Sequence, residues 1–468
     1  MNGCLKERLR GYVEEFNRND PDDWHGSIAN EQAYEFLVGR IPLVDLPDKE
    51  MERTYYFRWW TYRKHVRKTP GGYILTEFLP DVPWAGKYNT INCAASFHLR
   101  EGRWMRDRED ILPQYVDFWL RGEGQALSYS YWLPASIAEY CEIQGNEAGF
   151  TAPRLDGLLR LFYERLERAK TPCGLYYSRD GRDGMEYSIS GSGVRPTLNS
   201  YLYADACALA RFARLSGRQQ EAQRLEEFAE TLRERMFALL WDRDFFKVLP
   251  EKWTDQVWEK RPDIDAENDV RELLGYIPWY FDIPEPEMDV AWNHLMQKEG
   301  FFAPYGLTTA EQRHPRFMEE HAHECLWNGP VWPYATTQTL VALANLLRRE
   351  NKTSLTREDY YRLLRQYALS HRRTLPDGRV IDWVDENMDP FTGRWLARDI
   401  LEGWGWRKEK GGYERGRDYN HSMFCDLVLS GLLGIGAGKD GELCVRPLIP
   451  EQWQSFRVEN LYFRGKTY

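Results

Sequence analysis

Two amphipathic helices follow one another in the stretch LNSYLYADACALARFARLSGRQQEAQRLEEFAETLRERMFALL, which runs from Leu198 to Leu240. Apolar residues recur at three- and four-residue spacing over Leu198–Ser216 and again over Glu221–Leu240. This is the period of a helix that buries one face. Two such helices in succession predict a helical hairpin.

Similar pairs of helices recur along the rest of the chain. The segments between them lack the Val/Ile-rich strands that a parallel β/α fold requires. The pattern therefore favours a mainly α protein, built as a toroid of helical hairpins. The further amphipathic stretches are Asp110–Leu120, Ala126–Glu142, Arg154–Ala169, Val331–Arg348, Arg357–Arg372 and His421–Leu433.

The C-terminal segment differs from the helical remainder. Over Leu443–Tyr468, Val, Tyr and Phe alternate with polar residues, as in a half-buried pair of strands. The alternation is still running at Tyr468, so we expect the last strand of this β element to be missing. We divide the chain into a catalytic helical domain over residues 1–440 and a β cap over residues 441–468.

The composition excludes several classes of protein. With 43% hydrophobic residues the chain has ample material for a packed core. Its net charge of −10 argues against a nucleic-acid partner. It has no run of about 18 apolar residues and begins with a charged amphipathic stretch, so we expect no membrane segment, no secretion signal and a cytoplasmic protein. The eight cysteines show no CxxC spacing, which is typical of reduced, buried thiols.

Aromatic residues are abundant, with 19 Trp and 28 Tyr. This exceeds what a core needs and is typical of grooves that stack sugars or other planar ligands. Four long connections rich in Gly, Pro and aromatic residues join the helices, and connections of such length usually carry function. They are Tyr73–Trp104, Thr171–Thr197, Phe301–Pro330 and Asp377–Asn420.

Two of these connections hold a glutamate among turn-forming residues. Glu186 lies in RDGMEYSISGSG and Glu386 in DENMDPFTG, where Asp389 precedes a proline and favours an Asx turn. Hydrolysis of a glycosidic bond needs one carboxyl group to protonate the leaving oxygen and a second to activate water or attack the anomeric carbon. Most of the 72 acidic residues are solvated, so spacing alone makes both glutamates no more than candidates.

Histidines stand beside aromatic residues in two further segments. HAHECLWNGPVWPY, residues 321–334, contains HxHE but not the HExxH spacing of a zinc helix, so we expect no metal. Its Trp327 and Trp332 either pack in the core or form a sugar platform. GRDYNHS, residues 416–422, makes Tyr419 and His421 candidates for the site.

Aromatic residues also crowd two N-terminal segments. YYFRWW, Tyr55–Trp60, is too apolar for a solvated helix face and is either buried packing or one wall of a cleft. FLPDVPWAGKYNT, Phe78–Thr90, is irregular and is a candidate for a second wall.

Four motifs in this order resemble those of a known group of glycosidases. The likeness extends from about Tyr55 to Arg464 and identifies the bacterial mannosylglycerate-hydrolase-like glycoside hydrolases, six-hairpin enzymes related to family 63 α-glucosidases and trehalases. It implies an (α/α)6 toroid of six helical hairpins, hydrolysis with inversion, and no cofactor. The motifs are GMEYS (residues 184–188), LNSYLYADA (198–206), WNGPVWP (327–333) and DENMDPFTG (385–393).

The resemblance assigns catalytic roles to individual residues. Glu186 occupies the position of the general acid, which is Asp in the family's GMDNS pattern, and Glu386 occupies that of the general base. Glu is one methylene longer than Asp and can still donate a proton, and Asp183 is the alternative acid. The carboxyl groups of an inverting pair stand roughly 6.5–9.5 Å apart.

Substrate-binding candidates follow from the same likeness and from the segments above. WNGPVWP corresponds to a substrate wall, and a loosely matching N-terminal segment bears a further tryptophan. Arg195 either pairs with an anionic group such as glycerate or forms an ion pair with an acidic neighbour. The full set is Trp84, Lys87, Asn89, Arg195, His323, Glu324, Trp327, Asn328, Trp332, Tyr419 and His421.

The sequence is thus interpreted as an inverting glycoside hydrolase that cleaves a small α-linked glucoside or mannoside, of disaccharide or glycosylglycerate type. Two alternatives stay open, as does the oligomeric state. A sugar lyase or epimerase on the same toroid would depend on Tyr419 and His421. A non-catalytic carbohydrate-binding relative would need neither Glu186 nor Glu386, and the presence of both in matching motifs disfavours it.

Overall fold

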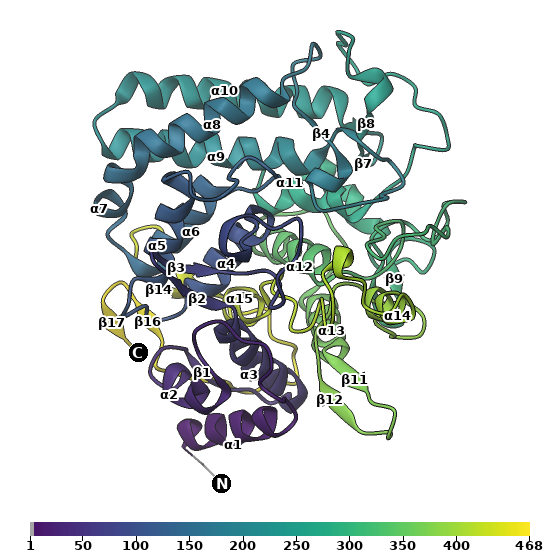
Figure 1. Cartoon of the computed structure of the whole chain (residues 1–468). Helices are drawn as coiled ribbons and strands as arrows, with labels where there is room; N and C mark the ends of the chain where they lie inside the picture. The colour runs from purple at the N-terminus through teal and green to yellow at the C-terminus, as the bar shows by residue number, and fades with distance from the viewer. Residues whose placement is uncertain (1–3) are drawn as a thin grey trace.

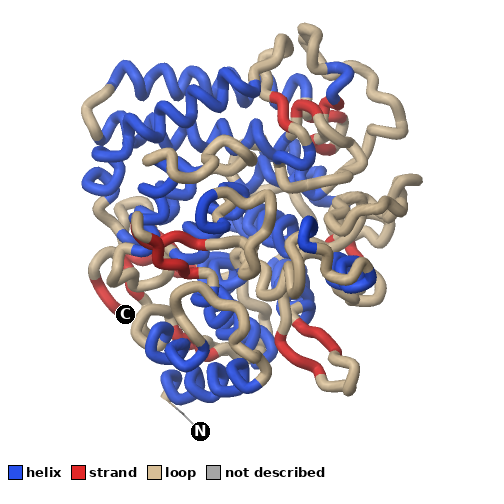
Figure 2. Tube along the Cα trace, viewed as in Figure 1, coloured by secondary structure: helices blue, strands red, loops and turns tan. Residues whose placement is uncertain are grey.

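Helices dominate residues 4–468, the part of the chain that the computed structural model describes, and the strands are short (Figures 1 and 2). Successive helices pack as hairpins around a shared core, which confirms the expected (α/α)6 toroid. The helices are α1 Leu5–Arg18, α2 Ala33–Leu37, α3 Lys49–Lys64, α4 Ala95–Gly102, α5 Ile111–Leu120, α6 Leu133–Gln144, α7 Glu147–Thr151, α8 Leu155–Ala169, α9 Pro196–Leu215, α10 Gln219–Leu239, α11 Ile277–Tyr280, α12 Pro333–Arg348, α13 Arg357–Ser370, α14 Leu396–Gly403 and α15 Phe424–Asp426, which continues as a π-helix over Leu427–Leu432.

Inner and outer helices differ in how much of their circumference is buried. Outer helix α10 buries one stripe, with the three- and four-residue spacing of an amphipathic helix. Its hairpin partner α9 is buried over nearly its whole length, as is α12, because outer helices cover them on one side and the toroid interior on the other. Helices α8, α9 and α10 lie side by side at the top of Figure 1.

The strands form small antiparallel sheets at the periphery of the toroid (Figure 2). The predicted C-terminal β element is present, but β15 pairs with β1 near the N-terminus and β14 pairs with β13. The strands are β1 Leu43–Asp45, β2 Val66–Thr69, β3 Gly72–Leu75, β4 Tyr177–Ser178, β5 Gly193–Val194, β6 Trp241–Asp242, β7 Phe245–Phe246, β8 Leu249–Pro250, β9 Phe302–Ala303, β10 Gly306–Leu307, β11 Arg372–Thr374, β12 Val380–Asp382, β13 Ile435–Ala437, β14 Leu443–Val445, β15 Arg457–Glu459, β16 Tyr462–Phe463 and β17 Lys466–Thr467.

Several helix boundaries differ from those expected from periodicity. The helix expected from Ala126 begins at Leu133, because residues 126–132 form part of a loop. The connections around residues 73–104 and 377–420 contain α4 and α14, which were missed. All eight residues of α4 are buried, so it has no polar face to create a periodic pattern. The YYFRWW segment lies on α3 and is buried packing.

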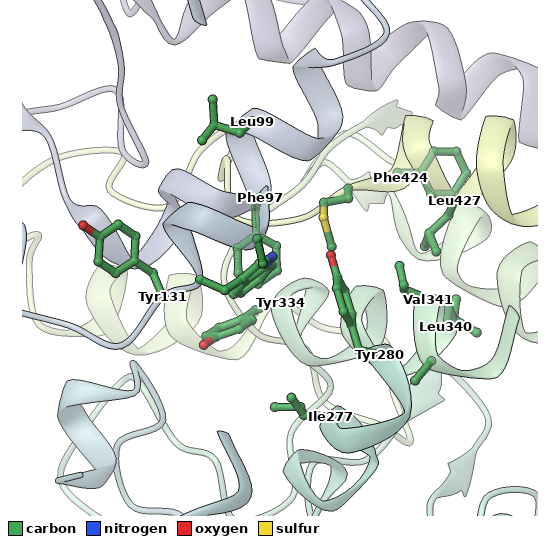
Figure 3. Packing of buried hydrophobic residues seen from close by; sticks show 14 of the residues in the cluster. Phe97, Leu99, Tyr131, Ile277, Tyr280, Tyr334, Leu340, Val341, Phe424 and Leu427 are labelled. Carbon is green, nitrogen blue, oxygen red and sulfur yellow. The ribbon is translucent and has the colours of Figure 1, made fainter. Parts of the chain in front are cut away.

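Aromatic side chains fill much of the core (Figure 3). Phe97 meets Tyr334 edge to face, with ring centroids 4.9 Å apart, and Trp132 meets Tyr280 in the same manner at 5.4 Å. No helix within residues 4–468 combines the length and the hydropathy needed to cross a lipid bilayer.

A buried carboxylate joins the N-terminal and C-terminal helices of the toroid. Asp426, at the end of α15, accepts hydrogen bonds from Arg100 Nε at 2.8 Å, Arg103 Nε at 3.0 Å and Trp104 Nε1 at 2.7 Å. Burial alone would raise the pKa of Asp426, but the two guanidinium groups outweigh it and lower the pKa to about 2. The ion cluster therefore ties α15 to α4 and to the turn that follows α4.

We expect Asp426→Asn to destabilise the fold by about 3–5 kcal/mol, because it leaves two buried guanidinium groups without their shared counter-charge. Urea unfolding at pH 7 measures the loss. The matched control is Asp156→Asn, whose ion pair with Arg218 is exposed and should contribute nothing measurable. Equal unfolding midpoints for the two variants would contradict this role.

Candidate active site

The four long connections meet around a cavity of about 290 Å³. Phe78 and Trp84 come from the first connection, Glu186 from the second, Cys325 from the third and Arg415 from the fourth. Residues that are distant in sequence therefore line one cavity, on the side of the toroid where the connections gather.

The loop that carries Glu186 is bent by residues in the left-handed region. Gly184 has φ +70°, and a Cβ there would lie 3.0 Å from Cys93 Sγ, while Tyr187 adopts φ +60° despite its side chain. Together these residues turn the partly exposed Glu186 into the cavity. Burial raises the pKa of Glu186 to about 8, and the charge of nearby Glu386 adds to the rise.

The loop that carries Glu386 is held by turns and by an arginine. The predicted Asx turn is present, since Asp389 Oδ1 accepts hydrogen bonds at 2.8 Å from two following backbone N–H groups. Arg415 Nη2 donates to both carboxylate oxygens of Glu386, one of them at 2.7 Å. Burial raises the pKa of Glu386 to about 7 even though the Arg415 charge opposes the rise.

The WNGPVWP segment connects the two glutamate loops. Trp327 N donates to Glu186 O at 3.0 Å, and Val331 and Met388 exchange two backbone hydrogen bonds of 2.9 Å. The indole of Trp327 stacks on Trp332 with ring centroids 4.7 Å apart. Both indoles are buried, but only Trp332 lines the cavity, and Trp327 supports it from behind.

Arg415 is the principal residue of the cavity that sequence reasoning missed. Its Nη1 donates to Glu324 Oε1 at 2.6 Å, and Lys410 Nζ donates to Glu324 Oε2 at 2.9 Å. Burial alone would raise the pKa of Glu324, but these two cations outweigh it and lower the pKa to about 2. Glu324 is therefore ionised and fixed within an ion cluster.

The same cluster bears on the HxHE segment as a metal site. Donor atoms of His323, Glu324 and Cys325 lie within 4.8 Å of one another, close enough to hold an ion. Both carboxylate oxygens of Glu324 already accept from cationic side chains, Lys410 and Arg415, whose charges repel a metal. The residues present do not fit a metal centre.

Tyr419 and His421 also line the cavity. His421 Nδ1 lies 2.7 Å from Glu77 Oε1 and 3.1 Å from the Tyr419 hydroxyl, and its ring stacks on Tyr334. Its Nε2 atom is buried and has no hydrogen-bond partner among residues 4–468. Glu77, which the sequence did not single out, fixes the orientation of the ring through Nδ1.

Other candidates lie at the edge of the cavity or outside its lining. Trp84 lines it and packs against the Arg415 guanidinium, 4.9 Å from the ring centroid. Lys87 is exposed and pairs with Glu123 at 3.0 Å. Asn89 is buried, and its amide donates to two backbone carbonyls of the loop that presents Trp84. Asn328 is also buried and bonded to backbone.

Arg195 and Asp183 form a buried ion pair behind the Glu186 loop. Arg195 Nε donates to Asp183 Oδ2 at 2.6 Å, and both side chains are fully buried. Asp183 Oδ1 also accepts from the hydroxyl groups of Ser130 and Ser178. Of the two roles considered for Arg195, the structure therefore shows the ion pair, and Asp183 lies outside the cavity lining.

A helical toroid whose loops bring two glutamates to one cavity presents the pair of carboxyl groups that glycosidic hydrolysis uses. The chain belongs to the mannosylglycerate hydrolase MGH1-like glycoside hydrolase domain family, whose model matches residues 87–422. This confirms the resemblance seen in the motifs and identifies a glycoside hydrolase domain. The chain has no significant match among curated protein sequences.

Solved structures share the fold. A protein described as a sialidase is 35% identical, with a TM-score of 0.87, over 98% of this chain and 41% of its own, so the chain spans less than half of that protein. A family 63 mannosylglycerate hydrolase from Thermus thermophilus, in complex with glucose, has a TM-score of 0.53 and 13% identity over 80% of this chain and 98% of its own. A Streptomyces avermitilis α-L-rhamnosidase complexed with L-rhamnose has a TM-score of 0.52 and 11% identity over 90% and 35%.

Proposed function

We propose that this glycosidase hydrolyses a small α-linked glucoside or mannoside with inversion, using Glu186 as general acid and Glu386 as general base. The placement of the two glutamates carries the proposal: both line one cavity, and Arg415 donates to the carboxylate of Glu386 but not to that of Glu186. The guanidinium favours the ionised form of Glu386, as a base requires, while burial raises the pKa of Glu186 and favours the protonated form that an acid requires.

In the proposed reaction Glu186 protonates the glycosidic oxygen, and the electron pair of the breaking C–O bond goes to that oxygen. Glu386 takes a proton from a water molecule as the water oxygen bonds to the opposite face of the anomeric carbon. Glu186 then regains a proton from solvent and Glu386 releases one. In this proposal His421 Nε2 and the Tyr419 hydroxyl bind sugar hydroxyl groups, which is supported by the position of both residues in the cavity lining.

The size of the cavity supports a small substrate. At about 290 Å³ it lies near the lower end of the range for small-molecule pockets, roughly 300–1,000 Å³. The Thermus thermophilus mannosylglycerate hydrolase has been solved with glucose and with Tris and D-glycerate, which supports a glucoside, mannoside or glycosylglycerate here.

The stereochemical prediction is that an α-glycoside yields the β-anomer of the free sugar first. Proton NMR during the first turnovers of a panel of α-glucosides, α-mannosides and glycosylglycerates records it. Glu386→Gln should lower the rate by about 10²–10⁴ because no group then activates water. The α-anomer as first product would contradict the proposed role of Glu386.

Glu186→Gln should separate substrates by leaving group. Hydrolysis of a methyl α-glycoside should fall by about 10²–10⁴, whereas an α-glycosyl fluoride, whose leaving group needs no proton, should lose far less. The fall in activity above about pH 8, which reports loss of the Glu186 proton, should be absent in this variant. Asp183→Asn is the matched control. If only that variant lost activity on the methyl glycoside while keeping it on the glycosyl fluoride, Asp183 would be the acid.

Arg415→Gln should move the acidic limb of kcat/KM to higher pH. Because the Arg415 charge lowers the pKa of Glu386, its removal raises that pKa above about 7, and less of the base is ionised at pH 7. Each unit of rise reduces activity there by about tenfold. Lys410→Met, which removes a cation that bonds Glu324 but not Glu386, should shift the limb less. If both variants shifted the acidic limb equally, Arg415 would act through the net positive charge of the cavity and not through its direct contact with Glu386.

A further inference from the structure

A larger hollow of about 760 Å³ lies next to the active-site cavity, and Tyr129 lines both. Its walls are α8, the loop between α5 and α6, and the segment from β4 to the turn at Asp180–Arg182. We call it the arginine hollow because its lining includes five arginines, Arg160, Arg165, Arg168, Arg179 and Arg182.

Three of these arginines have partners that build the hollow. Arg165 donates to the carbonyl groups of Tyr129 and Ala126, both at 2.9 Å, and so fixes the loop that separates the two cavities. Arg160 donates to a backbone carbonyl at the end of α5, and Arg168 pairs with Glu164, the acidic residue in the lining.

Arg179 and Arg182 carry uncompensated charge. Both are exposed, and neither forms a salt bridge within residues 4–468. The Arg182 guanidinium lies over the ring of Tyr129, 5.4 Å from its centroid. In a chain of net charge −10, this concentration of positive charge in a hollow favours an anionic ligand.

The rest of the lining suits a saccharide. Tyr129 and Tyr177 are half-buried aromatic rings, and Gln125 and Ser128 add an amide and a hydroxyl group. Aromatic faces with a few hydrogen-bonding groups are typical of sites that hold sugar rings.

The hollow lies on the side of Glu186. Arg182 ends the turn from which the Glu186 loop continues, and Ser130 N donates to Arg182 O at 2.8 Å. Tyr129 lines both the hollow and the active-site cavity, so its ring lies within reach of both. A general acid faces the leaving group, so the leaving group of a bound substrate would extend from Glu186 toward the hollow.

We propose that the arginine hollow binds an anionic saccharide unit, a uronate or a sulfated sugar, on the leaving-group side of the bond that is cleaved. The direction rests on the proposed role of Glu186, whereas the ligand class rests on the hollow itself. Carboxylate and sulfate oxygens match the planar fork of Arg179 and Arg182, and the ring of the sugar packs on Tyr129 or Tyr177.

Calorimetric titration tests the proposal without requiring bond cleavage, so a missing glycosidase activity would not affect the result. The probes are two matched pairs, tri-galacturonate with its methyl ester and 6-O-sulfated maltotriose with maltotriose, and inorganic sulfate. The variant is Arg179→Gln/Arg182→Gln. The control is Arg214→Gln/Arg218→Gln, which removes the same charge at the turn between α9 and α10.

At least one acidic trisaccharide should bind about tenfold more tightly than its neutral counterpart, and the preference should disappear in the hollow variant but persist in the control. Absence of any acidic preference in both pairs would overturn the proposal, as would a preference that survives the hollow variant. If inorganic sulfate bound as tightly as the acidic trisaccharides, the hollow would be an anion site without specificity for sugars, and the saccharide assignment would be overturned. Unchanged melting temperatures of both variants establish that they are folded.

Discussion

The ion cluster of Arg415 with Glu324 and Glu386 determines how the active site is assembled. The fully buried guanidinium of Arg415 pairs with Glu324 from the third connection and with Glu386 from the fourth. It also packs on Trp84 from the first connection. None of these connections has a helix or strand at the point of contact. Removing the cation would leave two buried anions without a partner, a change that costs several kcal/mol in proteins. These ion pairs, and not hydrogen bonds between helices or strands, thus hold the loops together over the toroid.

The cluster also distinguishes the two glutamates. Burial raises the pKa of both Glu186 and Glu386, and the charge of Glu386 raises that of Glu186 further. Arg415 contacts Glu386 directly and lowers its pKa relative to burial alone, whereas its effect on Glu186 is the smallest of the causes. Because Arg415 bonds Glu386 and not Glu186, its charge favours the ionised form of Glu386 more than that of Glu186.

The sequence predicted the features that a local pattern encodes, such as amphipathic helices and motif loops. It did not predict the features that arise from tertiary contacts. The outer helices α8 and α10 were expected because each has one buried stripe, but α4 is buried on every side and has no pattern. Motifs identified the loops of Glu186 and Glu386. Arg415 was missed because its partners lie 29 and 91 residues away, and nothing near it in the chain marks it. For Arg195, the sequence allowed either an ion pair or a contact with the ligand. The position of Asp183 behind the Glu186 loop, which no local pattern encodes, shows that it forms the ion pair.

The charge distribution places a constraint on how an anionic saccharide would be recognised. A chain of net charge −10 repels anions at long range, but at physiological ionic strength this repulsion is screened beyond about 8 Å. Exposed guanidinium groups such as Arg179 and Arg182 therefore act only after the ligand has entered the arginine hollow. Their direct contacts with an acidic group then provide selectivity between acidic and neutral sugars. Tyr129, whose backbone carbonyl accepts from Arg165, lines both the hollow and the cavity of Glu186, so a saccharide held in the hollow would share one wall with the sugar beside Glu186.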